Sequence, residues 1–141
     1  MTGRVRFTGN VGRAEIADYF AAADVFVHAA ELEAAGNVVL EALASGCGVV
    51  VTDCGGPAEY VEDGVTGFVA PVGDAAGLAS HVETLLSMPG LRDRFADEGR
   101  RRVEQRHQYS RMMSDLRDLY DQMGLPAGIA PVPNQVQTVR P

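Results

Sequence analysis

Two glutamates, Glu33 and Glu41, have a residue type and a spacing that could carry chemistry, with seven residues between them. Glu33 falls in a loop after an apolar stretch, and Glu41 falls in the first turns of the helix expected next. Carboxylates accept hydrogen bonds from neutral hydroxyl groups, so such a pair suits a ligand that carries several hydroxyls. The spacing by itself favours a simpler interpretation, in which Glu33 stabilises a helix N-terminus and Glu41 is a solvated helix residue.

The small residues that follow Glu33 predict a second kind of binding group. Residues 34–37 (AAGN) stand where a loop enters a helix, so their backbone N–H groups lack partners within the helix and add to the positive end of its dipole. In an open α/β sheet, ligands bind at this edge, outside the carboxyl ends of the strands. The loop therefore predicts an anion site that is built from backbone groups.

The charge pattern explains why backbone groups would be needed. The chain has 141 residues, a formal net charge of −7 and 12 basic residues, all of which are Arg. Residues 14–91 carry 12 carboxylates and neither Arg nor Lys, so an anion bound there has no local side-chain cation. An acidic chain of this kind argues against nucleic-acid binding and against a polybasic membrane anchor.

Length and composition predict one globular domain. The chain is 46% hydrophobic and 22% charged, which is typical of a folded protein, and no apolar run approaches the roughly 18 residues of a membrane span. Cys47 and Cys54 are the only cysteines. A metal site needs more ligands close by, so we expect two reduced thiols. We also expect a cytoplasmic location.

Short apolar runs alternate with helical patterns along most of the chain. We expect strands at 5–8, 24–28, 48–52 and 67–70, and helices at 13–22, 37–45, 57–62, 74–87, 91–106 and 110–123, the last with Ser110 as N-cap. This alternation, without hairpin signals, predicts an α/β fold with a partial doubly wound (Rossmann-like) parallel sheet of about four strands, flanking helices and a C-terminal helical segment. We expect a domain over residues 1–123 and an extended Pro-rich tail over 124–141.

Several segments, taken in order, resemble a known family. The Glu33–Glu41 pair with GNVVLEALASG, followed by VVVTDCGGPAEYVEDGVTGFVAP, is similar to the C-terminal half of a GT-B glycosyltransferase. The most similar group is the retaining class with a Glu-x7-Glu motif (glycosyltransferase family 4). VRFTGNV, ADVFVHAA and QYS resemble further segments of that domain, so the match runs from about Val5 to Leu119.

The resemblance implies a role for each candidate residue. Glu33 would be the catalytic residue, meeting hydroxyls of the donor sugar near the reacting carbon, and Glu41 would accept hydrogen bonds from the ribose hydroxyls. The other residues implied are Ala34, Ala35, Gly36, Asn37 and Val38 at the donor diphosphate, and Gly9, Asn10 and Val11 beside the nucleobase. The donor would be a UDP- or GDP-linked sugar. No cofactor and no metal are implied, since the chain has no Asp-x-Asp pair.

The resemblance covers only part of such an enzyme. The acceptor-binding N-terminal domain and the first two strand–helix units of the donor domain, with their Arg and Lys, lie outside the matched part. Catalysis depends on groups placed in advance around the leaving phosphate, so we expect this chain alone to transfer sugar poorly to an acceptor that the sequence does not specify. One alternative is a non-catalytic sugar-nucleotide-binding or interaction module with a degenerate site. A less favoured one is a related GT-B epimerase or phosphorylase-like enzyme.

The expected topology leaves one edge of the sheet open. In the usual strand order 3-2-1-4-5-6, this chain supplies strands 3 to 6, so the strand at 5–8 lacks its usual neighbour and one side of the strand at 24–28 is unpaired. An open edge invites pairing. We therefore expect either that the strand at 5–8 moves against the strand at 24–28, or that the chain self-associates through this edge.

Overall fold

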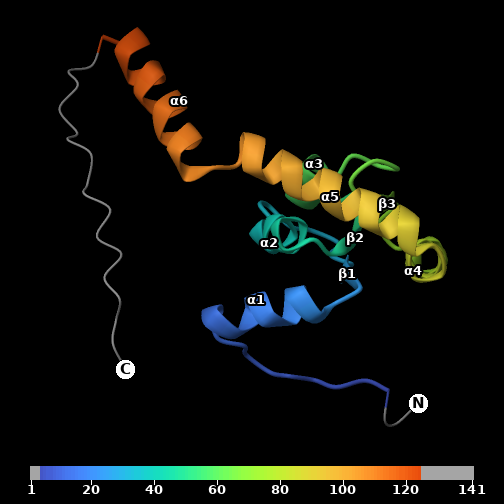
Figure 1. Ribbon diagram of the computed structural model, residues 1–141. Helices are drawn as coiled ribbons and strands as arrows, with labels where there is room; N and C mark the ends of the chain where they lie inside the picture. Colours follow the sequence, from blue (N-terminus) through green and yellow to red (C-terminus); the bar gives the residue numbers. More distant parts are fainter. Residues whose placement is uncertain (1–3, 125–141) are drawn as a thin grey trace. The chain divides into compact units, whose positions relative to one another are not determined.

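The computed structural model describes residues 4–124, which fall into two compact units that divide after Gln105. The helices are α1 (Arg13–Ala22), α2 (Asn37–Ser45), α3 (Gly55–Tyr60), α4 (Ala75–Ser87), α5 (Pro89–Arg106) and α6 (Tyr109–Gln122), and the strands are β1 (Val25–His28), β2 (Gly48–Thr52) and β3 (Phe68–Ala70) (Figure 1). The helices and the last three strands expected from the sequence are thus confirmed within a few residues at their ends.

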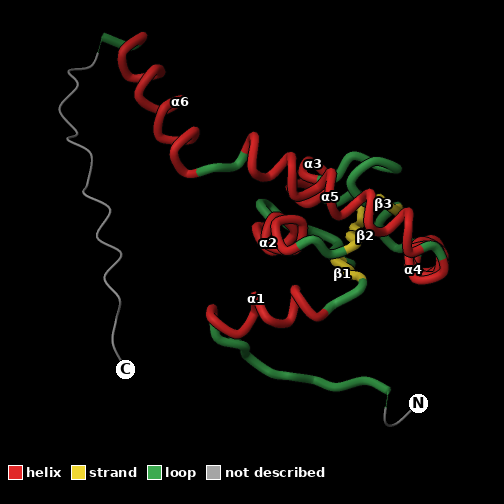
Figure 2. Tube along the Cα trace, viewed as in Figure 1, coloured by secondary structure: helices red, strands yellow, loops and turns green. Residues whose placement is uncertain are grey.

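The strands form one parallel sheet with β2 in the centre, in the order β1-β2-β3 (Figure 2). Val25 lies opposite Gly48, and Val50 lies opposite Phe68. All five residues of β2 are buried, as a parallel strand covered on both faces requires. The α/β class with a parallel sheet and flanking helices is confirmed.

Helices cover both faces of the sheet because successive side chains of β2 point to opposite sides. Val49 and Val51 belong to one buried cluster, with residues from α1 and α2, whereas Val50 belongs to a second cluster with residues from α4 and α5. Other buried members of the first cluster are Phe20, Val39, Ala42, Leu43, Cys47 and Val61, and those of the second are Leu85 and Phe95. This division is the doubly wound arrangement predicted from the sequence.

The expected strand at 5–8 is not formed, so the sheet has three strands rather than four. Residues 5–8 run as an irregular, exposed segment before α1, and the side chain of Phe7 is 93% exposed. In the order 3-2-1-4 this strand is separated from β1 by two other strands, and an extended segment without a neighbour cannot satisfy its backbone groups through a sheet. The prediction that it would move against β1 is therefore wrong. Self-association through the open edge stays a prediction.

Helix ends differ from the sequence-based expectation where caps decide them. Asp74 is the N-cap of α4, since its Oδ1 accepts a 2.8 Å hydrogen bond from the Gly77 N–H. The N-cap of α6 is Gln108 rather than Ser110, which lies inside the helix. The helix expected at 57–62 starts earlier, at Gly55.

The second unit, from Arg106 onward, contains α6, whose residues are all at least partly exposed. The predicted domain boundary at 123 stays a prediction, and residues 125–141 of the expected Pro-rich tail lie outside the described residues. Among residues 4–124, no helix is long and apolar enough to cross a membrane.

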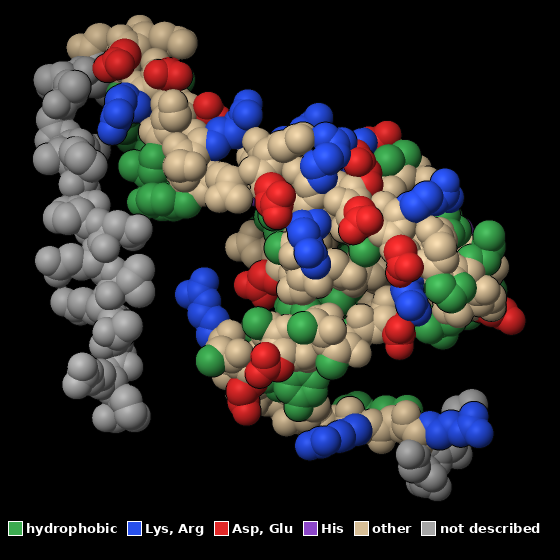
Figure 3. Space-filling model, viewed as in Figure 1, with side chains coloured by type: hydrophobic (Ala, Val, Ile, Leu, Met, Phe, Trp, Pro, Cys, Tyr) green, Lys and Arg blue, Asp and Glu red, His purple; other side chains and the backbone are tan. Residues whose placement is uncertain are grey.

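Arg and acidic side chains alternate over α5, and Figure 3 shows them interspersed on this face. Glu98 accepts hydrogen bonds from both Arg101 and Arg102, and Arg102 also pairs with Glu62 in the loop after α3. The two guanidinium groups lower the pKa of Glu98 to about 2. Arg101 and Arg102 of α5 are thus paired with carboxylates.

Candidate functional site

The loop from residue 29 to residue 36 joins the carboxyl end of β1 to the N-terminus of α2. Gly36 is the N-cap of α2 and has φ +66° and ψ +40°, a left-handed conformation that favours glycine. Gly36 is buried, whereas Asn37, the first helical residue, is exposed. The chain therefore presents a helix N-terminus to solvent at the sheet edge where ligands bind in this class of fold.

The Glu33 carboxylate turns back onto this helix N-terminus. Its Oε1 accepts hydrogen bonds from the backbone N–H groups of Ala35 and Gly36, both at 3.3 Å. Among the described residues, the N–H groups of Asn37 and Val38 have no hydrogen-bond partner. The loop thus holds four N–H groups in the region where the sequence predicted an anion site, and Glu33 stabilises two of them.

Glu41 lies one helical turn after Asn37, so the two exposed residues share one face of α2. A ligand that meets the first turn of α2 along this face would pass over Asn37 and reach the Glu41 carboxylate. Glu33 thus lies in the loop against the N-terminus of α2, and Glu41 lies on the exposed face of the helix, one turn after its first residue.

The turn that follows β2 packs against the Glu33 loop. The backbone N–H of Gly56 donates a 3.2 Å hydrogen bond to the carbonyl oxygen of Glu33, and Pro57 packs against Gly36. The sequence pattern did not assign this turn to the site. The available signal was topological: the pair Gly55-Gly56 directly follows a parallel strand, so it lies at the same sheet edge as the loop after β1.

Thr52, at the end of β2, is a second residue that the sequence analysis missed. Its side chain is buried, and its Oγ1 donates a 2.6 Å hydrogen bond to the carbonyl oxygen of Ala30. β2 and its following turn therefore contact the loop near its start, through Ala30, and at Glu33. The loop is held at both points by one strand end.

The predicted nucleobase loop lies elsewhere in the first unit. Gly9 has φ +67°, Gly9 and Asn10 are exposed, and Val11 is half-buried just before α1. Within residues 4–124 no hydrogen bond joins these three residues to the Glu33 loop. Their role at a nucleobase stays a prediction.

Two cysteines and two histidines lie in or next to the hydrophobic core. Cys47 and Cys54 are both free and buried; the Cys47 thiol donates to the carbonyl oxygen of Phe20 at 2.9 Å, and burial raises the pKa of this thiol. His28 ends β1 half-buried, with its Nδ1 buried and unpaired within the described residues. His81 stacks on Phe68, with ring centroids 4.4 Å apart.

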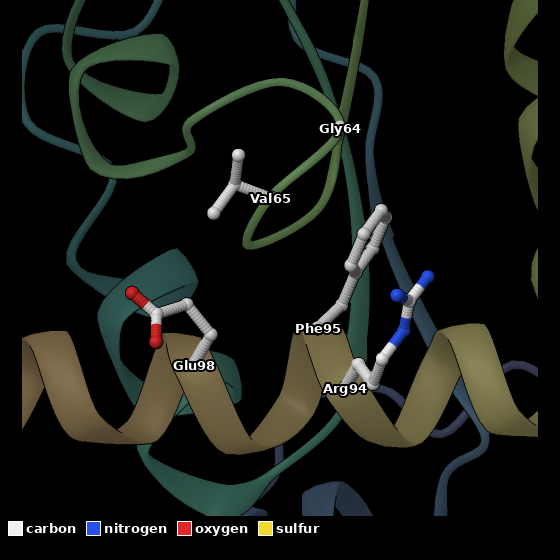
Figure 4. Close-up of a pocket in the computed structure, with 5 residues that line it drawn as sticks. All are labelled: Gly64, Val65, Arg94, Phe95 and Glu98. Carbon is white, nitrogen blue, oxygen red and sulfur yellow. The ribbon is translucent and has the colours of Figure 1, made fainter.

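A separate shallow pocket lies between α5 and the turn before β3 (Figure 4). Its lining residues are Gly64, Val65, Arg94, Phe95 and Glu98. Figure 4 shows the charged groups of Arg94 and Glu98 pointing away from one another on either side of Phe95. The pocket therefore lacks converging polar groups of the kind that fix a ligand. Over residues 4–124, no group of three His, Cys, Asp or Glu side chains is arranged to hold a metal ion.

Comparison with known proteins agrees with this architecture. Residues 1–102 match the family described as glycosyl transferases group 1. The chain is 39% identical over 99 residues to the lipopolysaccharide core biosynthesis glycosyltransferase LpsE of Rhizobium meliloti, covering 70% of this chain and 28% of that protein. It is 46% identical over 68 residues to a GDP-mannose-dependent alpha-mannosyltransferase of Mycobacterium tuberculosis, covering 48% of this chain and 18% of that protein.

Solved structures show the same fold. Sucrose-phosphate synthase from Thermosynechococcus elongatus matches with a TM-score of 0.80 and 30% identity, covering 86% of this chain and 30% of that one. Anabaena HepE in complex with UDP-glucose matches with a TM-score of 0.72 and 28% identity, covering 78% of this chain and 30% of that one. The chain spans less than a third of the length of these relatives. The family match covers well over half of the chain, and the chain therefore belongs to the glycosyl transferases group 1 family.

Proposed function

We propose that this chain is the donor-binding portion of a retaining, metal-independent glycosyltransferase of family 4, which transfers a sugar from a UDP- or GDP-linked donor to an acceptor. One observation carries the proposal. The loop that bears Glu33 runs into the exposed N-terminus of α2 at the carboxyl edge of a parallel sheet, in a chain whose family is that of group 1 glycosyl transferases.

Each part of the donor has a group to meet it. The N–H groups from Ala35 to Val38 are suited to the diphosphate, because they are hydrogen-bond donors at the positive end of a helix. Glu41, one turn further on, is suited to the ribose hydroxyls. Glu33 would meet the sugar hydroxyls near the reacting carbon, and the segment of Gly9, Asn10 and Val11 would lie beside the base.

The relatives support both donor classes. HepE of Anabaena has been solved in complex with UDP and with UDP-glucose, and one relative is a GDP-mannose-dependent mannosyltransferase. We propose a cytoplasmic location, in the same compartment as the nucleotide-sugar donor. We expect transfer by this chain alone to be poor, since residues 14–91 offer no Arg or Lys to stabilise the leaving diphosphate.

Calorimetry tests the donor-site proposal. Titration of the chain with UDP, GDP, UDP-glucose and GDP-mannose is expected to show binding of at least one ligand with a Kd of about 1 mM or tighter. In the variant Glu41→Gln this binding should weaken, because a neutral amide accepts a weaker hydrogen bond from a hydroxyl than a carboxylate does. The matched control is Glu83→Gln, an exposed residue of α4, which should bind as the parent chain does. If none of the four ligands binds, the donor-site assignment is wrong.

A non-catalytic sugar-nucleotide-binding or interaction module is the second candidate, and the same lack of cations in residues 14–91 favours it. A donor-hydrolysis assay with UDP-glucose and GDP-mannose separates the two functions. Release of UDP or GDP that is lost in Glu33→Gln would support an enzyme. Binding without release, at protein concentrations above the measured Kd, would support the binding module.

A further inference from the structure

A glycine is required at residue 56 by the close approach of the loop rather than by the backbone conformation of Gly56 itself. Its φ is not positive, unlike that of its neighbour Gly55 at +43°, so a residue with a side chain can adopt the conformation of Gly56. The space around it is the constraint. A Cβ at this residue would lie 2.6 Å from the carbonyl oxygens of both Ala34 and Ala35, a distance that real Cβ contacts do not reach.

The same turn contacts the loop at two further points. A Cβ on Gly55 would collide with the carbonyl oxygen of Glu33. From the other side, a Cβ on Gly36 would lie 2.6 Å from the Cγ of Pro57. The loop backbone therefore packs directly against the backbone of the turn at residues 33–35, and against the Pro57 ring at Gly36.

A hydrogen bond between the turn and the loop fixes the distance between their backbones. The Gly56 N–H donates to the Glu33 carbonyl oxygen at 3.2 Å, while the Glu33 carboxylate accepts from Ala35 and Gly36. Both the backbone and the side chain of Glu33 are thus set by atoms within one tight contact. Moving Gly56 away from the loop would move the carboxylate and the N–H groups together.

We propose that Gly56 is a positioning residue for the donor site, acting through the Glu33–Gly36 loop without touching the ligand. The inference rests on the proposed function, because it names what places that site. It predicts that a methyl group at residue 56 displaces the loop and changes sugar-nucleotide binding more than it changes the rest of the fold.

The test compares Gly56→Ala with two other glycine variants. In Gly67→Ala the new Cβ would lie 2.5 Å from the carbonyl oxygen of Val49, so this variant is equally crowded but touches no residue of the loop. In Gly90→Ala the new Cβ meets nothing within 4 Å and φ is not positive. We expect Gly56→Ala and Gly67→Ala both to lower Tm, and Gly90→Ala to leave Tm unchanged.

Binding separates positioning from stability. For Gly56→Ala we expect affinity for UDP-glucose to fall about ten-fold, with a smaller loss for UDP, because ångström-scale misplacement of binding groups has effects of this size. Gly67→Ala, measured well below its Tm, should bind both ligands as the parent chain does. Equal losses in Gly56→Ala and Gly67→Ala would overturn the inference.

A readout without ligand keeps the inference separate from the proposed function. Amide hydrogen exchange at Ala35 and Gly36 should accelerate in Gly56→Ala and not in Gly67→Ala, because only the first variant disturbs the Glu33 hydrogen bonds. If the parent chain binds neither UDP nor UDP-glucose, the proposed function fails, and the exchange rates alone then decide whether Gly56 positions the loop. Unchanged exchange in a folded Gly56→Ala chain would overturn the inference even if the ligands bind.

A second variant covers the case in which Gly56→Ala does not fold. Pro57→Ala removes the ring on which Gly36 rests and adds no atom to the crowded turn. We expect the same direction of change as in Gly56→Ala, with faster exchange at Gly36 and weaker UDP-glucose binding. A folded Pro57→Ala chain with parent-like exchange and binding would count against the inference.

Discussion

At the scale of single residues, the Glu33 carboxylate and the proposed donor diphosphate compete for the same N–H groups. Glu33 accepts hydrogen bonds from Ala35 and Gly36, which are two of the groups proposed to face the phosphates. Binding would therefore require the carboxylate to leave these donors, and the proposed contact with sugar hydroxyls gives it new partners. The two glutamate interpretations left open by the sequence are thus compatible, because the capping carboxylate and the sugar-binding carboxylate can be one group in two contacts.

This competition predicts that removing the Glu33 carboxylate raises the affinity for UDP and lowers the preference for UDP-glucose over UDP. In Glu33→Ala, UDP should bind more tightly by about five-fold, since removing a like charge a few ångströms from a phosphate is worth roughly 1 kcal/mol in water. The extra affinity of UDP-glucose over UDP should fall, because the hydroxyl acceptor is lost. Calorimetry on both ligands measures the two effects. Weaker binding of UDP, or an unchanged preference for UDP-glucose over UDP, would contradict this role for Glu33.

At the scale of elements, α2 is placed by its buried face. Leu43 is 1% exposed in the cluster between α1, α2 and β2, and Gly99 of α5 lies against its side chain. Leu43 is buried together with Val39 and Ala42 of the same helix, and its close packing helps to fix the position of the site on α2.

Removing that side chain should cost stability. We expect Leu43→Ala to lower the free energy of unfolding by about 2–5 kcal/mol, the range for large-to-small changes in a core. Leu86→Ala is the control, because Leu86 is 52% exposed on α4 and such surface changes are usually within about 0.5 kcal/mol. Urea unfolding followed by circular dichroism measures both. Similar losses in the two variants would show that α2 is not anchored in this way.

The ion pairs of α5 give a pH dependence whose sign follows from Glu98. Its pKa is lowered to about 2 by the Arg101 and Arg102 guanidinium groups, against an ordinary value of about 4.3 in an unfolded chain. A lowered pKa in the folded state contributes stability that is present above the unfolded value and is lost as pH falls towards the folded value. The pH window is therefore from about 4.3 down to about 2.

Glu98→Gln should flatten the stability profile within that window, because the variant lacks the pairs that stabilise the parent chain above it. We expect Tm of the variant to be modestly lower near neutral pH and to approach that of the parent chain towards pH 2. Thermal unfolding between pH 2 and pH 7 measures the profile. Glu104→Gln, on the same helix and exposed, is the control and should keep the parent slope. A parent-like slope in Glu98→Gln would show that the pairs with Arg101 and Arg102 do not contribute in solution.

At the scale of the whole molecule, the outer edge of β1 has no partner strand among residues 4–124. Within the described residues β1 pairs with β2 alone, and the segment at 5–8 lies elsewhere as an exposed chain. Parallel strands are normally covered on both faces, and an edge strand presents a row of unpaired backbone groups. The edge therefore offers backbone N–H and C=O groups to another chain.

Self-association through this edge should depend on concentration. Size-exclusion chromatography with light scattering is expected to show a rising mass as the protein concentration increases, and Val27→Lys should reduce it, because a charged side chain on an edge strand opposes pairing. Val27 is 42% exposed, so the variant does not bury a charge. Leu86→Lys on α4 is the control. A constant monomer mass for the parent chain would contradict association through β1.

Much of the fold could be predicted because its signals are local. The apolar run of β2 and the Gly46 that ends α2 are properties of neighbouring residues, and the structure confirms both elements. The strand at 5–8 has a similar local pattern and fails, because a strand also needs a partner. The N-caps of helices could be predicted only in part. Asp74 serves as an N-cap and Ser110 does not, although both residue types favour that role.

Local patterns along the chain predict the order of helices and strands, the family resemblance, and the chemical groups of the loop between Glu33 and Val38. Tertiary structure alone decided that the turn at Gly56 carries that loop, and that the Glu33 carboxylate rests on the N–H groups of Ala35 and Gly36. The physical reason is separation along the sequence. Periodicity and charge are properties of neighbouring residues, whereas the approach of Gly56 to Glu33 joins two distant segments that only the parallel pairing of β1 and β2 brings to one edge.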